Sequence, residues 1–100
     1  MLTRGETIAV LRETYPYLAA HDGVRRIGLF GSYAHGTPSV SSDVDLVIEF
    51  DRPIGFQFVE LSEYLESALG KRVDILTPAG IQGIRIRRVA EAIEGSVAYV

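Results

Sequence analysis

Three aspartates in the sequence could together hold divalent cations. Asp43 and Asp45 belong to a stretch that alternates apolar and polar residues, so on a strand both point to one face, roughly 6.5 to 7 Å apart along the backbone. Asp74 lies in a second β-type stretch and would join them if the two strands pair. Such carboxylates repel one another unless cations neutralise them, and all-oxygen ligands favour Mg²⁺ or Mn²⁺. An isolated Asp-x-Asp is also typical of the solvated side of an exposed strand.

A glycine and a serine, Gly31 and Ser32, follow directly on a β-rich run and open a loop. Backbone N–H groups at such a strand-to-helix turn point outward and attract phosphate oxygens, while the serine hydroxyl adds a donor. A plain turn with Ser32 as its N-cap is the simpler alternative. Together with the aspartates, the pair predicts a phosphate-binding loop beside a metal site.

The elements that position these residues follow from the periodicity. Helical spacing of apolar residues predicts three helices, at 3–20, 58–69 and 86–95. Runs of β-type residues predict four strands, at 24–30, 43–50, 72–76 and 97–100, the first of them central. The loop 31–42 is expected to contain one helical turn at 32–35. This order predicts an α+β fold, a small mixed sheet with helices packed on one face and the chemistry on the other.

Length and composition narrow the classes of protein further. One hundred residues with 47% hydrophobic and 23% charged side chains predict a single domain over 1–100. A net charge of −3 argues against direct DNA binding through phosphate neutralisation. The absence of cysteine excludes disulfides, thiolate zinc sites and a cysteine nucleophile. No apolar run is long enough to span a membrane, so we expect no membrane partner. The absence of cysteine fits a cytosolic setting, and we expect a cytoplasmic protein.

The motif residues together resemble a known family. The run Gly31-Ser32-Tyr33-Ala34-His35-Gly36, followed by Ser42-Asp43-Val44-Asp45-Leu46, is similar to the signature of the DNA polymerase β-like nucleotidyltransferase superfamily, and Asp74 is placed like its third aspartate. The length resembles that of the minimal nucleotidyltransferases of prokaryotes. The resemblance covers nearly the whole chain and is strongest over 29–48. Many minimal members carry Arg where His35 stands here, and an imidazole is a weaker phosphate partner than a guanidinium.

The resemblance implies a polymerase β-like core that transfers a nucleoside monophosphate from a nucleoside triphosphate, expected to be ATP, to a hydroxyl. Asp43 and Asp45 would hold two Mg²⁺ ions, with Mn²⁺ as the other candidate metal. Asp74 would bind the ion at the acceptor and help to deprotonate its hydroxyl. Gly31 and Ser32 would hold the outer phosphates.

A protein is the expected acceptor, because so small a domain has little surface with which to enclose a small molecule. Minimal family members resemble antitoxins that pair with small helical HEPN-type ribonuclease toxins, and some attach adenylate to a toxin tyrosine. We therefore expect a hetero-oligomer with such a toxin. Two alternatives stay open: an antitoxin that acts by occlusion without catalysis, and a transferase for small molecules such as aminoglycosides, whose enzymes carry extra domains.

Three further features each allow two interpretations. A basic cluster near the third helix could meet a polyphosphate or an acidic partner, or could be a solvated face; it comprises Arg85, Arg87 and Arg88. Tyr33 could stack on a base or pack against the sheet. The apolar segment 97–100 could form an unpaired edge or be buried against the domain.

Overall fold

The computed structural model describes residues 2–39 and 41–100, so that residues 1 and 40, which fall within the expected domain and loop, lie outside the described residues. The elements in chain order are α1 (Arg4–Asp22), β1 (Val24–Phe30), α2 (Gly31–His35), β2 (Val44–Phe50), α3 (Gln57–Leu69), β3 (Val73–Leu76), α4 (Pro78–Gln82), α5 (Arg87–Ser96) and β4 (Ala98–Tyr99). Across the described ranges, none of the helices combines the length and apolarity needed to cross a membrane.

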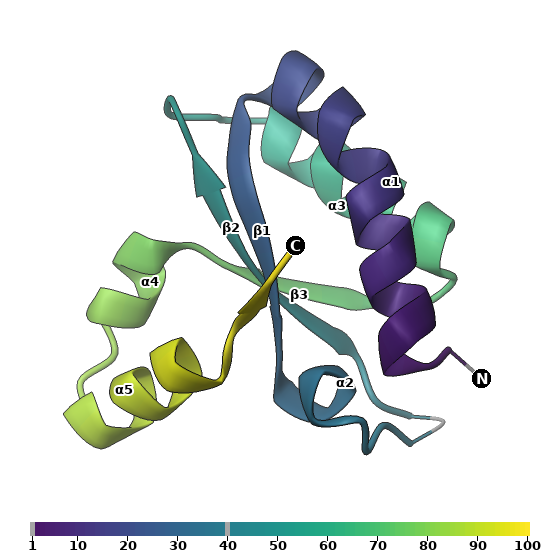
Figure 1. Cartoon of the computed structure of the whole chain (residues 1–100). Helices are drawn as coiled ribbons and strands as arrows, with labels where there is room; N and C mark the ends of the chain where they lie inside the picture. Colours follow the sequence, from purple (N-terminus) through teal and green to yellow (C-terminus); the bar gives the residue numbers. More distant parts are fainter. Residues whose placement is uncertain (1, 40) are drawn as a thin grey trace.

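The strands form one mixed sheet in the order β3-β2-β1-β4. β1 pairs antiparallel with both β2 and β4, whereas β2 and β3 run parallel. The parallel pair is connected through α3, as a crossover between parallel strands requires. The expected α+β class with a small mixed sheet is therefore confirmed, and β1 is an internal strand as predicted (Figure 1).

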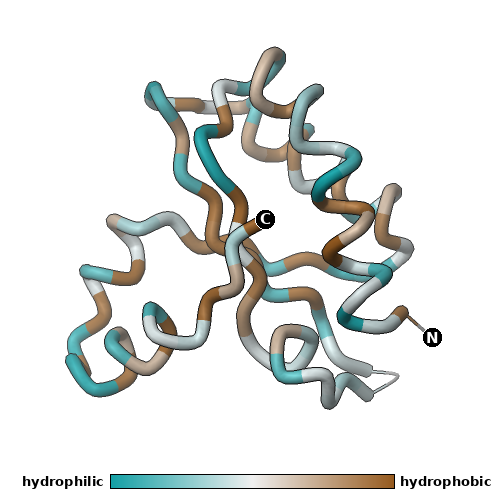
Figure 2. Tube along the Cα trace, in the orientation of Figure 1, coloured by the Kyte–Doolittle hydropathy of each residue, from teal (hydrophilic) through white to brown (hydrophobic). Residues whose placement is uncertain are grey.

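The main core lies between one face of the sheet and the helices α1 and α3 (Figure 1). Leu11 and Leu18 of α1 are fully buried, as are Leu65 of α3 and the strand residues Ile27 and Leu46. Each such side chain contributes about 1.5 to 3 kcal/mol through burial. Figure 2 shows hydrophobic residues concentrated along the central strands that this core covers.

The opposite face of the sheet is covered in part by α4 and α5 (Figure 1). Val47 of β2 packs there with Ile81 of α4 and Ala90 of α5. Side chains alternate along a strand, so Val47 points away from its buried neighbours Leu46 and Ile48. The expectation that helices pack on one face holds for α1 and α3 but not for α4 and α5.

The element ends follow local signals. Thr3 forms a capping box with Glu6, in which the Glu6 N–H donates to Thr3 Oγ1 at 3.1 Å and the Thr3 N–H donates to Glu6 Oε1 at 3.0 Å. Gly70, directly after the predicted helix end at residue 69, caps α3 in the left-handed conformation. The sequence prediction missed α4, although Thr77 and Pro78 form a standard helix start in which Thr77 Oγ1 accepts from the Gly80 N–H.

Candidate active site

Asp45 and Asp74 lie side by side on neighbouring strands. In the parallel pairing of β2 with β3, their Cα atoms are register partners. Neighbouring strands are about 4.8 Å apart, and paired residues point to the same face of a sheet. Val73 and Ile75, on either side of Asp74, pack into the main core, so Asp74 points to the opposite face, where it is exposed. The two carboxylates therefore share one face, as the sequence predicted.

Asp43 joins this pair from the loop that leads into β2, because the strand begins at Val44. Three effects raise the pKa of Asp45 above its ordinary value: burial, which is the largest, then repulsion from Asp74, then repulsion from Asp43. The three carboxylates thus form one cluster of like charge, which we call the acidic cluster.

The acidic cluster has the donor chemistry of a magnesium site, since all its potential ligands are carboxylate oxygens. Within residues 2–39 and 41–100, however, no three His, Cys, Asp or Glu side chains are gathered closely enough to hold an ion. Convergence on one cation therefore requires the carboxylates to change rotamer. Cation binding would favour that change because it cancels their mutual repulsion.

Gly31 brings the loop onto the acidic cluster. Its φ of +72° is in the left-handed region, and a Cβ atom at this position would overlap Oδ2 of Asp45. Ser32 follows in α2, and its carbonyl accepts a hydrogen bond from the Thr37 N–H at 3.0 Å. Arg4 Nε donates to the Ala34 carbonyl at 2.8 Å and so ties α2 to the first turn of α1. The predicted phosphate-binding pair and the aspartates are therefore neighbours.

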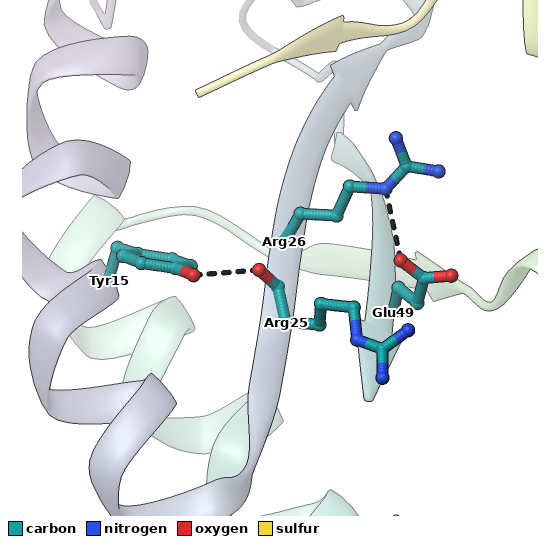
Figure 3. A network of polar contacts seen from close by, with 4 residues as sticks. All are labelled: Tyr15, Arg25, Arg26 and Glu49. Atoms are coloured by element: carbon teal, nitrogen blue, oxygen red, sulfur yellow. Dashed lines mark hydrogen bonds and ion pairs between the residues drawn. The ribbon is translucent and has the colours of Figure 1, made fainter. Parts of the chain in front are cut away.

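Tyr33, for which the sequence allowed two interpretations, and Glu49 of β2 both lie apart from the acidic cluster. Tyr33 is fully buried in the main core, which excludes stacking on a base in this conformation. Glu49 accepts a hydrogen bond from Arg26 Nε at 3.1 Å (Figure 3). In the same region the Tyr15 hydroxyl donates to the Arg25 carbonyl at 2.7 Å. Glu49 is thus an ion-pair partner and not a member of the acidic cluster.

The basic residues near α5 divide between two surfaces. Arg87 pairs with Glu91 at 3.2 Å, the i,i+4 interaction expected for a solvated helix face. Arg88 instead lines a groove together with Gly31 and His35. Sequence reasoning grouped the three arginines and could not separate them, because only the tertiary position of α5 relative to α2 decides which one faces the loop.

Comparison with known proteins finds a matching family and similar relatives. A family model described as "Nucleotidyltransferase domain" matches residues 11–95. "Protein adenylyltransferase MntA" of Thermococcus cleftensis is 38% identical over 101 residues, which span 100% of this chain and 98% of that protein. "Putative protein adenylyltransferase MJ1379" of Methanocaldococcus jannaschii is 37% identical over 103 residues, 100% of both chains.

Solved structures share the fold. One, "Structure of putative minimal nucleotidyltransferase", superposes with a TM-score of 0.73 at 31% identity and covers 97% of this chain and 95% of its own. Another, "Crystal structure of the toxin-antitoxin with AMP-PNP", has a TM-score of 0.62 at 24% identity, covers 98% of this chain and 72% of its own, and supports the fold alone. The chain therefore belongs to the nucleotidyltransferase domain family, as its resemblance to the minimal nucleotidyltransferases indicated, and it is a nucleotidyltransferase.

Proposed function

We propose that this nucleotidyltransferase transfers AMP from ATP to a hydroxyl group of a partner protein in a Mg²⁺-dependent reaction. The observation that carries the proposal is the alignment of Asp45 with Asp74, with Gly31 against Asp45. Support for a protein acceptor comes from the relative named a protein adenylyltransferase, which matches this chain over its whole length.

The reaction joins the acceptor oxygen to the α-phosphorus of ATP. The bond between that phosphorus and the bridging oxygen breaks, and its electron pair leaves with pyrophosphate. The proton of the acceptor hydroxyl passes to the carboxylate of Asp74, which is exposed and so accessible to a protein acceptor. Bound Mg²⁺ would stabilise negative charge on the entering and leaving oxygens.

The remaining site residues orient the nucleotide. Asp43 and Asp45 would supply the carboxylate oxygens that hold the metal, and Asp45 is fixed on β2 by its pairing with both neighbouring strands. Gly31 and Ser32 would bind the outer phosphates through backbone N–H groups and the serine hydroxyl. Holding both reactants in line lowers the barrier mainly through position and electrostatics.

The proposed acceptor is a small helical HEPN-type ribonuclease toxin, with this chain as its antitoxin in a cytoplasmic hetero-oligomer. Two lines support this proposal: the resemblance of the motif residues to those of minimal nucleotidyltransferases, and a shared fold with a protein crystallised as part of a toxin-antitoxin pair with AMP-PNP.

Intact-mass measurement of the partner tests the proposal. The chain is purified together with a small helical HEPN-type toxin and incubated with ATP and Mg²⁺. We expect the partner to gain the mass of one or more AMP groups. A double variant carrying Asp43→Asn and Asp45→Asn should give no gain. Glu49→Gln, which changes a carboxylate on β2 outside the acidic cluster, should behave as the wild type.

An unchanged partner mass with the wild-type chain would refute transfer to that protein. Neutralisation of the toxin by the double variant, at the level of the wild type, would show that occlusion and not adenylylation inactivates it. The two functions are thereby separated in one set of proteins.

A further inference from the structure

A groove of about 660 Å³ lies between α2 and α5, next to the acidic cluster. We call it the α2–α5 groove. Its walls come from the end of β1, from α2 and from one side of α5, and they are formed by Phe30, Gly31, His35, Arg88, Val89, Ala92, Ile93 and Ser96. The two helices that border it lie close together at the same end of the sheet (Figure 1).

The pairing of the strands places this groove beside the aspartates. Phe30 is the register partner of Asp45 across β1 and β2, and Asp45 is the partner of Asp74 across β2 and β3. The three side chains therefore form a row on one face of the sheet. Gly31 belongs to the groove wall and also lies against the Asp45 carboxylate. A molecule bound at the acidic cluster would extend directly into the groove.

One cation in the groove is available to a ligand. Arg88 is exposed, and within the described part of the chain it makes no hydrogen bond or ion pair. Arg87, the preceding residue, is held by Glu91 and borders a different hollow together with Arg85. Only Arg88 of this basic cluster lines the α2–α5 groove, where it accompanies His35.

Apart from Arg88 and Ser96, the α5 side of the groove is apolar and consists of Val89, Ala92 and Ile93. Ligand pockets combine such apolar walls, which cover a planar base or sugar, with a few charged groups that bind its polar end. The acidic cluster and a triphosphate both carry negative charge and repel each other. The Arg88 guanidinium, which lines the groove, would offset this repulsion more strongly than the His35 imidazole.

We propose that Arg88, which lines the α2–α5 groove together with Gly31 and His35, binds the phosphates of the nucleoside triphosphate there. The apolar wall of α5 then holds the nucleoside. This inference rests on the proposed function, because it assigns a further binding residue to the same reaction.

Titration of the full chain with Mg²⁺ and ATP tests the assignment, with isothermal calorimetry as the readout. Arg88→Gln should weaken Kd by about 10- to 100-fold, the effect of losing hydrogen bonds to a charged group. Arg88→Lys should recover part of the loss, because it restores the charge but not the fork of donors. Arg87→Gln is the matched control and should bind within about twofold of the wild type, since Arg87 already pairs with Glu91.

A second variant tests the groove itself. Ala92 is exposed on α5, so Ala92→Phe should leave the fold intact, as circular dichroism would verify, while filling the space. We expect ATP binding to fall at least tenfold. Binding equal to that of the wild type in either Arg88→Gln or Ala92→Phe would overturn the inference.

These outcomes are distinct from those of the proposed function. A wild-type chain that neither binds ATP nor modifies its partner would overturn both. A different result would be a wild-type chain that modifies its partner and an Arg88→Gln variant that binds ATP equally well but binds the partner more weakly. That result would overturn only the assignment of Arg88 and would indicate that the groove binds the protein partner.

Discussion

Gly31 lies so close to Asp45 that a Cβ atom at position 31 would overlap the Asp45 carboxylate. Gly31 also has a φ of +72°, a conformation that side-chain-bearing residues rarely adopt. Two independent requirements therefore select glycine where the loop meets the acidic cluster. Gly36, five residues on, meets only the second requirement: its φ is +75°, but no atom of the described residues beyond its local chain neighbours lies within 4 Å of the place its Cβ would take.

Gly31→Ala should therefore cost more than Gly36→Ala. Both variants carry the left-handed penalty of about 1 to 2 kcal/mol in the free energy of unfolding. Gly31→Ala must in addition displace Asp45, and we expect it to lower AMP transfer at least tenfold, because small misplacements of reacting groups cost large factors in rate. Thermal unfolding and the rate of partner modification measure the two effects. Equal transfer rates in the two variants would show that the contact with Asp45 has no part in the chemistry.

The sequence predicts the elements of this site better than their relation to one another. β1 is predicted at its observed bounds because a β-rich run ends abruptly at Gly31, and the alternation around Asp45 identifies β2. The register that places Asp74 beside Asp45 depends on the pairing of β2 with β3, which α3 separates in the sequence. Hydrophobic periodicity does not encode such nonlocal pairing. The position of Arg88 in the groove depends in the same way on how α5 packs against Val47. α4 is missed because Gly80 and Gly83 weaken its helical pattern, despite a clear start at Thr77.

Asp45→Asn should stabilise the metal-free protein while abolishing transfer. Burial and the charges of Asp74 and Asp43 raise the pKa of Asp45, so its ionised form destabilises the fold at neutral pH. Removing that charge should raise the unfolding temperature by a few degrees in the presence of EDTA. Asp51→Asn is the control, because Asp51 pairs with Arg52 at 3.4 Å and should give no such gain.

The difference in stability between Asp45→Asn and the wild type should depend on pH in one direction only. A carboxyl group with a raised pKa in the folded state destabilises the protein above that pKa, and the effect is lost as the pH falls through it and the group is protonated. The advantage of Asp45→Asn over the wild type should therefore shrink in acid. Added Mg²⁺ should stabilise the wild type and not the variant. A variant that is less stable than the wild type at neutral pH without metal would contradict the repulsion within the acidic cluster.

Tyr33→Phe should leave transfer unchanged and raise stability. Tyr33 is fully buried, and its hydroxyl has no hydrogen-bond partner among the residues that the structure describes. Replacing a buried, unpaired hydroxyl with hydrogen removes a desolvation penalty of about 1 to 3 kcal/mol without leaving a partner unsatisfied. Chemical denaturation should show a higher midpoint at an unchanged slope. Loss of ATP binding on this substitution would mean that the hydroxyl reaches the nucleotide in a conformation other than the one described.

Gly28→Ala should detach β4 from the sheet. Gly28 is the register partner of Tyr99, and a Cβ atom there would overlap the Val97 side chain and lie 3.0 Å from the Tyr99 ring. The Tyr99 ring also stacks under Arg26, whose guanidinium carbon is 4.2 Å from the ring centroid. Because overpacking of this kind costs about 1 to 3 kcal/mol, we expect lower stability and a shift of the last strand.

Hydrogen exchange at the Val100 amide reports on that shift directly, because this N–H donates to the Ile27 carbonyl at 2.9 Å across the β4 edge. Exchange should accelerate in Gly28→Ala. Gly95→Ala provides the opposite control. Gly95 lies within α5, and outside its own helix backbone no atom of the described residues lies within 4 Å of the added Cβ, so alanine should stabilise the helix by about 0.5 to 1 kcal/mol. Unchanged protection of Val100 in Gly28→Ala would show that β4 is held by contacts other than its pairing with β1.

Because α5 leads directly into β4, loosening β4 in Gly28→Ala should also weaken ATP binding in the α2–α5 groove. Gly95→Ala should leave ATP binding unchanged.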